Sequence, residues 1–172
     1  GKVFLIDFVD NTVSRHSTGH RNPQGIINTK SGNVLAVEHG PEGGDELNRI
    51  HQGKHYGWPV RTFGVNYGDW VWPLNEMNGS HDGYEQPLMS WTPAIGPSDL
   101  TEITSQDSPW KNDIIISGMR AKSLFRLKLN DNGINFIEKI EIGRRIRKIE
   151  FLEGRVFLKD QVTGEIGFFD VN

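Results

Sequence analysis

The sequence predicts an all-β fold and, within that class, a β-propeller of four-stranded antiparallel blades. Short runs of β-favouring residues recur between turn signals such as Lys30-Ser31-Gly32 and Glu153-Gly154. No window of a dozen residues shows helical apolar spacing without a Gly or Pro, and the chain has 20 glycines and 8 prolines. From Leu100 onward the runs repeat in units of roughly 40 to 45 residues, as propeller blades do. A β-sandwich is the competing architecture.

The runs that predict strands are spread along the whole chain. The expected strands are Lys2 to Phe8, Gly25 to Thr29, Asn33 to Val37, Asp113 to Ser117, Ser123 to Leu129, Asn135 to Ile142, Ile146 to Phe151, Arg155 to Lys159 and Glu165 to Val171. Between them, Asp69 to Tyr84 is expected to be a long loop over one face. The strands amount to about three blades, whereas a closed ring needs 4 to 8. We therefore expect residues 1–172 to form one partial propeller domain, completed by upstream blades, by a complementary chain or as a homodimer.

Composition narrows the classes of partner. The 172 residues include 19 Lys and Arg against 22 Asp and Glu, a net charge of -3, so no overall basic field favours nucleic acid or a membrane surface. The absence of cysteine excludes a disulfide framework, a thiolate metal site and a cysteine nucleophile. Apolar runs such as Ile114 to Ile116 are far shorter than the roughly 20 residues of a membrane-spanning helix. We expect no membrane span, and any anion site must be local.

Arginines at the starts of strands and turns are the first candidate site residues. Arg21, Arg120 and the group Arg144, Arg145 and Arg147 occupy equivalent places in successive units, and such places converge at one end of a propeller channel. Arg145 and Arg147 are two residues apart, so on a strand they share a face and can clamp carboxylates. The alternatives are a solvated edge that discourages strand pairing and, for Arg21, a turn stabilised by Asn22 and Pro23.

The block from Glu38 to Asn48 is the second candidate. Its Gly-Pro pair and neighbouring glycines leave carbonyl oxygens accessible, and carbonyl and carboxylate oxygens are the ligands that calcium prefers. The alternative is a polar loop in which Asp45 caps its own backbone. Two further blocks, Tyr56 to Pro59 and Ser90 to Pro93, place large rings beside prolines, where they would stack on a planar ligand or sugar or simply cover blade ends.

Taken together, these blocks resemble the glucose/sorbosone dehydrogenase family, which includes soluble quinoprotein glucose dehydrogenases and aldose sugar dehydrogenases. The resemblance runs from Gly1 to about Val171. It rests on five motifs in the family's order: Gly-His-Arg-Asn-Pro-Gln-Gly at 19–25, Glu-His-Gly-Pro at 38–41, Gly-Asp-Glu-Leu-Asn at 44–48, Tyr-Gly-Trp-Pro at 56–59 and Arg-Arg-Ile-Arg at 144–147. The family fold is a six-bladed β-propeller, which agrees with the fold predicted from the strand pattern.

The resemblance implies two cofactors, pyrroloquinoline quinone and Ca²⁺. Arg21 and Asn22 would contact the quinone, and Arg120 would lie near its reactive carbonyl. Arg145 and Arg147 would pair with its carboxylates. The carbonyls of Gly40 and Pro41 would ligate the calcium that polarises the quinone, and Tyr67 and Glu85 fall near a second calcium site of the family.

The resemblance also implies oxidation of an aldose sugar by hydride transfer to the quinone, followed by an external electron acceptor, in a periplasmic or secreted protein. The family's histidine base lies upstream of the Arg-Asn-Pro motif, so we expect no catalytic base in this chain; His39 is a local histidine without that alignment. Two other classes stay open. One is a cofactor-free propeller that serves as a binding or scaffolding module, and the other is a calcium-dependent propeller hydrolase using Glu38, Glu42, Asp45 and Glu46.

Overall fold

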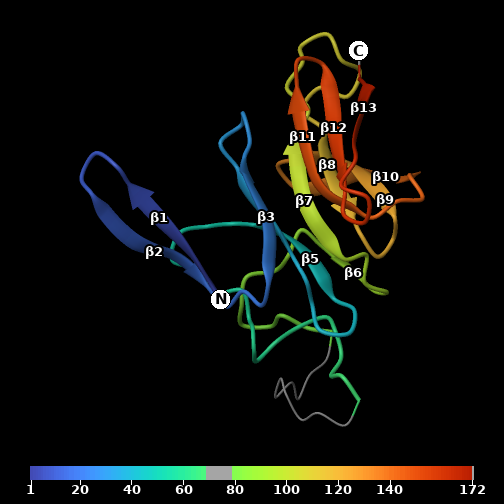
Figure 1. The fold of residues 1–172 in the computed structure, drawn as a ribbon. Helices are drawn as coiled ribbons and strands as arrows, with labels where there is room; N and C mark the ends of the chain where they lie inside the picture. Colours follow the sequence, from blue (N-terminus) through green and yellow to red (C-terminus); the bar gives the residue numbers. More distant parts are fainter. Residues whose placement is uncertain (69–78, 172) are drawn as a thin grey trace.

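The computed structural model describes residues 1–68 and 79–171, and within them every regular element is a β-strand (Figure 1). The strands are β1 (Lys2–Asp7), β2 (Thr12–Thr18), β3 (Pro23–Asn28), β4 (Val34–Glu38), β5 (Asp45–Arg49), β6 (Met89–Trp91), β7 (Pro97–Glu102), β8 (Ile114–Gly118), β9 (Ser123–Asn130), β10 (Gly133–Glu141), β11 (Ile146–Leu152), β12 (Arg155–Asp160) and β13 (Ile166–Asp170). No helix able to cross a membrane occurs in these two stretches.

The strands form four antiparallel sheets in chain order. Strands β3 to β6 make one four-stranded sheet and β7 to β10 another, while β11 to β13 form a three-stranded sheet and β1 pairs only with β2. Each strand of a sheet pairs with its neighbour in sequence, which is the meander of a propeller blade. The predicted all-β propeller of four-stranded blades is confirmed, with two complete blades, one of three strands and a separate hairpin.

The first strands of successive blades lie next to one another. Strand β7 packs against both β3 and β11, and a Cβ on Gly25 of β3 would lie 2.9 Å from Cα of Asp99 on β7. The carboxylate of Asp99 in turn accepts a hydrogen bond of 3.0 Å from the backbone nitrogen of Ile149 on β11. This side-by-side placing of first strands is how blades surround an axis.

Apolar residues fill the spaces between the blades. One buried cluster joins the β3–β6 and β7–β10 blades through residues such as Leu35, Leu47 and Ile116. A second joins the β7–β10 and β11–β13 blades through Ile115, Leu124 and others. Neighbouring residues of β8 thus face opposite clusters, as the alternation of a strand requires. These two cores hold neighbouring blades in place relative to one another.

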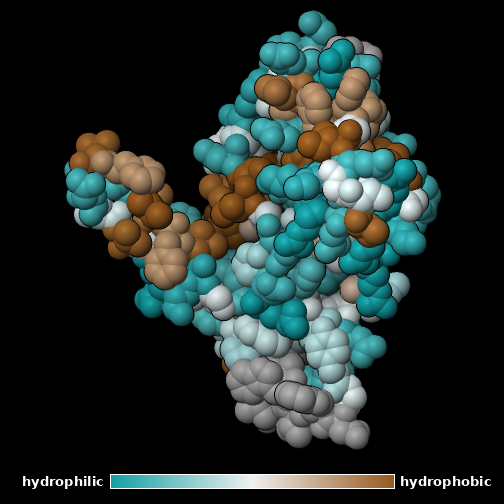
Figure 2. All heavy atoms as spheres, in the orientation of Figure 1, coloured by the Kyte–Doolittle hydropathy of each residue, from teal (hydrophilic) through white to brown (hydrophobic). Residues whose placement is uncertain are grey.

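The β1–β2 hairpin extends away from the blades and presents apolar side chains to solvent. Figure 1 shows it projecting on the left, and Figure 2 shows brown side chains along it. Phe4, Leu5 and Ile6 are more than half exposed, as is Val13 on the partner strand. A two-stranded sheet alone is marginally stable in water, so this hairpin is suited to pairing with further strands.

The expected strands are found, with ends that differ by a few residues, but four strands were not predicted. These are β2, β5, β6 and β7. Strand β5, Asp-Glu-Leu-Asn-Arg, and strand β7, Pro-Ser-Asp-Leu-Thr-Glu, carry few apolar residues, so the alternation that signals a strand is missing. Within the expected loop Asp69 to Tyr84, residues 69–78 lie outside the described part of the chain.

Candidate functional site: a cleft lined by arginines

A cleft of about 440 Å³ opens where loops of the first two blades meet the start of the third. Its residues come from the segment before β3, the β4–β5 loop, Tyr67, the segment before β7, the β8–β9 turn and the turn before β11. The lining residues include Arg21, Asn22, His39, Gly40, Pro41, Asp45, Tyr67, Gly96, Met119, Arg120 and Arg145. Seven of the nine residues predicted to hold a cofactor or metal therefore meet in one cleft.

Arg21 has the most contacts of the arginines that line the cleft. Its backbone nitrogen donates a hydrogen bond of 2.6 Å to the Glu38 carboxylate, and its Nη1 donates one of 3.1 Å to the carbonyl of His39. The guanidinium lies 5.3 Å from the centre of the Trp58 ring, within the range of a cation–π contact. Its buried Nε has no hydrogen-bond partner among the described residues. Arg21 is thus half-buried and retains an unused donor.

The other arginines approach the cleft from the second and third blades. Arg120 lies in the β8–β9 turn and Arg145 immediately before β11, and both line the cleft. Arg145 donates from Nε to Gln161 at 3.2 Å. Arg147 does not line the cleft itself. Its Nη1 lies 3.9 Å from the sulfur of Met119, and Met119 does line the cleft. The predicted convergence of these cations is therefore seen in the fold.

None of these four arginines forms an ion pair with a carboxylate of the described residues. Elsewhere Arg126 pairs with Asp113, Arg144 with Glu165 and Arg155 with Asp170. The acidic residue in the lining of the cleft, Asp45, accepts hydrogen bonds from the backbone nitrogens of Gly40 and Gly96 and does not pair with an arginine. Arginine forks match carboxylates and other planar anions well. A cleft with several unneutralised guanidiniums is suited to a polyanionic ligand.

The carbonyl groups at the predicted calcium position are also available. Gly40 and Pro41 line the cleft, and neither carbonyl accepts a hydrogen bond from a described residue. The turn is held from behind, because Asp45 accepts a hydrogen bond of 3.0 Å from the Gly40 nitrogen. It is also closely packed, since a Cβ on Gly40 would lie 2.2 Å from the carbonyl oxygen of Gly43.

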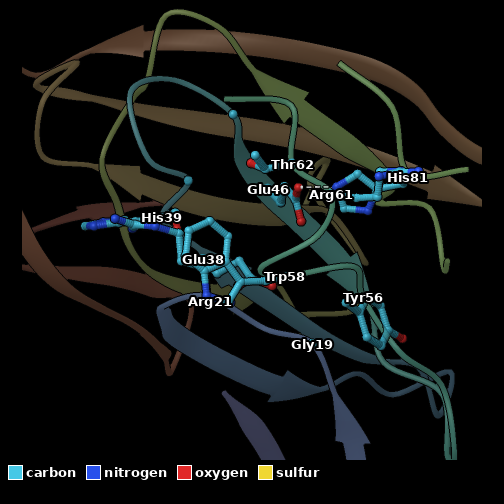
Figure 3. Close-up of a pocket in the computed structure, with 12 residues that line it drawn as sticks. Gly19, Arg21, Glu38, His39, Glu46, Tyr56, Trp58, Arg61, Thr62 and His81 are labelled. Atoms are coloured by element: carbon cyan, nitrogen blue, oxygen red, sulfur yellow. Dashed lines mark hydrogen bonds and ion pairs between the residues drawn. The ribbon is translucent and has the colours of Figure 1, made fainter. Parts of the chain in front are cut away.

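A buried polar network lies next to this turn, and Figure 3 shows three of its members, Glu38, Glu46 and His81. Glu38 accepts hydrogen bonds from His20 and Asn48, and Asn48 also donates to Glu46 at 3.1 Å. Glu46 in turn lies 3.0 Å from His81. Burial lowers the pKa of His81, but its contacts with Glu46 outweigh this and the pKa lies above its usual value. The pocket among these residues, about 10 Å³, has room for roughly one water and not for an organic ligand.

Glu85 is not among the residues that line the cleft. Its carboxylate pairs with Lys54 at 3.3 Å and its carbonyl accepts from His81, whereas Tyr67 lines the cleft. In the described part of the chain no three His, Asp or Glu side chains are arranged to hold a metal ion. The second calcium site stays a prediction.

Several residues of the cleft were not predicted from the sequence. His39 is one, and its Nε2 donates a hydrogen bond of 2.7 Å to the Pro97 carbonyl while its own carbonyl accepts from Arg21. Gly96 and Met119 are others. Their only sequence signal was adjacency, since Met119 precedes Arg120 and His39 precedes the Gly-Pro pair. Of the aromatic blocks, Tyr56 and Trp91 are buried in cores, whereas Trp58 lies against Arg21.

Comparison with known proteins shows which family the chain resembles in sequence and fold. The Glucose / Sorbosone dehydrogenase family matches residues 7–166. The aldose sugar dehydrogenase YliI of Escherichia coli is 34% identical over 157 residues, which are 87% of this chain and 42% of that protein. A crystal structure of a glucose dehydrogenase superposes with a TM-score of 0.82 at 32% identity, over 97% of this chain and 49% of the other.

A more distant structure extends the fold comparison. The PQQ-bound form of an aldose sugar dehydrogenase from Streptomyces coelicolor has a TM-score of 0.66 at 23% identity, over 90% of this chain and 44% of the other. The chain spans less than half the length of each of these proteins. Fold and cleft together define an arginine-lined portion of a β-propeller. The chain belongs to the glucose/sorbosone dehydrogenase family.

Proposed function

We propose that this chain provides the quinone-binding part of a pyrroloquinoline-quinone-dependent dehydrogenase that oxidises an aldose sugar. The observation that carries the proposal is the convergence of Arg21, Arg120 and Arg145 on one cleft without acidic partners among the described residues. Pyrroloquinoline quinone has three carboxylates, so it requires this kind of surface. The aldose substrate is inferred from the relative in Escherichia coli, whose name states that class.

The residues present fit the quinone. Arg21 has an unpartnered buried Nε, and Arg145 and Arg147 have guanidinium groups free of described carboxylates. Arg145 and Arg147 would bind carboxylates of the quinone, while Arg21 and Asn22 would contact it from the first blade. Arg120 would lie near the reactive carbonyl. When bound, the quinone supplies the two-electron acceptor for the sugar hydride, and the protein orients the two reactants.

Calcium fits the same cleft. The free carbonyls of Gly40 and Pro41 are hard oxygen ligands, which is the chemistry that Ca²⁺ prefers. Two carbonyls alone are too few, so the cofactor and water would complete the coordination. The ion would polarise the quinone. The hydrogen bond from the Gly40 nitrogen to the Asp45 carboxylate would keep the two carbonyls in place.

The general base that accepts the sugar hydroxyl proton is not assigned to a residue of this chain. His39 lines the cleft, but its Nε2 is engaged by the Pro97 carbonyl and the family motif does not give it that role. The base is expected upstream of the Arg-Asn-Pro motif. An external acceptor would reoxidise the quinone, and we propose a periplasmic or secreted location from the family resemblance.

We propose that further strands complete the propeller beside the two-stranded and three-stranded sheets of this chain. The hairpin of β1 and β2 exposes Phe4, Leu5 and Ile6, and the sheet of β11 to β13 exposes Ile166 and Phe168 on its last strand. Additional blades, from a longer protein, a complementary chain or a homodimer, would cover these groups. Size-exclusion chromatography with light scattering of the natural protein distinguishes the cases, because a compact natural monomer with the mass of 172 residues would contradict all three.

The proposed function is tested by titrating the purified protein with pyrroloquinoline quinone, with calcium and with a chelator, while following quinone absorbance. Saturable binding that requires calcium supports it, and adding an aldose to the complete protein, with its base, should then bleach the quinone band. Absence of quinone binding in the complete protein would contradict the proposal. Calcium binding without quinone binding would favour the hydrolase. A protein that binds neither calcium nor quinone would favour the cofactor-free binding module.

A further inference from the structure

The Glu38 carboxylate accepts hydrogen bonds from four separate groups. Its Oε1 accepts from Nδ1 of His20 at 2.9 Å and from Nδ2 of Asn48 at 2.8 Å. Its Oε2 accepts from the backbone nitrogens of Arg21 at 2.6 Å and Asn22 at 3.3 Å. Glu38 is 4% exposed, and it is the last residue of β4. This one side chain therefore connects strands β4 and β5 to the segment that precedes β3.

The groups that hold Glu38 are themselves fixed. His20 is 1% exposed, and its ring stacks on Tyr56 with centroids 4.5 Å apart. Because a carboxylate only accepts, Nδ1 of His20 carries the hydrogen of that contact, and Nε2 lies 2.8 Å from the hydroxyl of Ser17. Asn48, also buried, comes from the neighbouring strand. The carboxylate consequently has little freedom to move.

The two backbone N–H groups that donate hydrogen bonds to Glu38 belong to residues that line the cleft proposed to bind the quinone. Arg21 and Asn22 both line the cleft, whereas Glu38 does not. We propose that Glu38 is a positioning residue, which orients the Arg21 and Asn22 backbone so that the Arg21 guanidinium faces the quinone. This inference rests on the proposed function for the identity of the ligand, but the backbone contacts exist without it.

The contacts of the Arg21 side chain explain why its backbone matters. The guanidinium is held by the His39 carbonyl and the Trp58 ring, which come from two other segments. A shift of the Arg21 backbone would change its distance to both. A purely structural buried carboxylate would stabilise the fold without influencing one particular arginine, so the two possibilities give different results in a double-mutant cycle.

Glu38→Gln is the variant of choice, because it retains the shape but replaces one acceptor oxygen by an NH₂ group that faces donors. Glu46→Gln is the matched control. Glu46 is also buried and also accepts from Asn48, but it does not contact the nitrogens of Arg21 or Asn22. If Glu38→Gln does not fold, His20→Phe preserves the ring on Tyr56 while removing the Nδ1 donor.

The first readout is backbone amide hydrogen exchange of the quinone-free protein. We expect exchange at Arg21 and Asn22 to accelerate at least about tenfold in Glu38→Gln, with β8 and β9 unchanged and with no acceleration in Glu46→Gln. His20→Phe should accelerate exchange at the same two amides by a smaller factor. Unchanged exchange at these two amides, or equal acceleration throughout the blades, would overturn the inference whether or not quinone binds.

The second readout is the dissociation constant for pyrroloquinoline quinone. We expect Glu38→Gln to weaken binding about tenfold in the wild-type background and less than about twofold in the Arg21→Ala background. Equal weakening in both backgrounds would contradict action through Arg21. Failure of the wild-type protein to bind quinone would instead contradict the proposed function, and the exchange experiment would still decide the role of Glu38.

Discussion

The carboxylate of Asp45 accepts a hydrogen bond of 2.7 Å from the backbone nitrogen of Gly96. Asp45 begins β5 of the first complete blade, and Gly96 immediately precedes β7 of the second. The other oxygen of Asp45 accepts from the Gly40 nitrogen. One buried side chain thus connects two blades at the cleft and fixes the carbonyl turn proposed to bind calcium.

Replacing Asp45 by Asn should destabilise the protein and weaken calcium binding. The amide NH₂ would face one of the two backbone donors and leave it unsatisfied, which costs roughly 1–3 kcal/mol. Chemical denaturation and calcium titration measure the two effects. Glu42→Gln is the control, because it removes the same charge from an exposed position in the same loop. Equal effects of both variants would show that charge, and not the Asp45 contacts, matters.

Replacing Gly44 by Ala should lower the stability of the fold far more than replacing Gly32 by Ala. Both have positive φ, +66° and +84°, so both variants carry backbone strain. Only at Gly44 would the new Cβ meet backbone, 2.1 Å from the Gly64 nitrogen, whereas nothing lies within 4 Å at Gly32. Thermal unfolding of the two variants checks this. A Gly44→Ala protein as stable as Gly32→Ala would show that the loop packs differently.

Tyr56 should make stability fall at high pH. Burial raises its pKa to about 12 from the usual 10, so the folded state retains the phenol proton longer than the unfolded state does. The associated stabilisation is complete below pH 10 and is lost as pH rises towards 12. The absorbance difference between wild type and Tyr56→Phe should show this late ionisation. An ionisation near pH 10 in the folded protein would contradict the burial of the hydroxyl.

The apolar strands were predictable from the sequence because they alternate or form short runs of β-branched residues. Ile114 to Ile116 and Ile146 to Phe151 are examples, and both lie in strands of the blades. Strands β5 and β7 were not predictable, because each buries polar side chains beside a single leucine. The buried carboxylates of Asp45 and Asp99 accept hydrogen bonds from backbone nitrogens distant in sequence, those of Gly96 and Ile149. Their burial depends on the assembled blades.

The candidate site was predicted in composition but not in its supporting contacts. Arg21, Arg120 and Arg145 were chosen because they occupy equivalent places in successive units, and the fold brings them together. The function of Glu38 could not be read from its motif. A Glu in a Gly- and Pro-rich block indicates a metal ligand as readily as a buried acceptor, and only the fold shows that it binds backbone nitrogens.

The central claim is that the unpaired arginines of the cleft bind the carboxylates of pyrroloquinoline quinone. The most direct measurement is a quinone titration, with calcium, of wild type, of Arg145→Ala with Arg147→Ala, and of Arg144→Ala with Arg155→Ala. The control arginines already pair with Glu165 and Asp170. Loss of two charge-assisted contacts should weaken binding at least about a hundredfold, with the control near wild type. Equal quinone affinity in all three proteins would contradict the account.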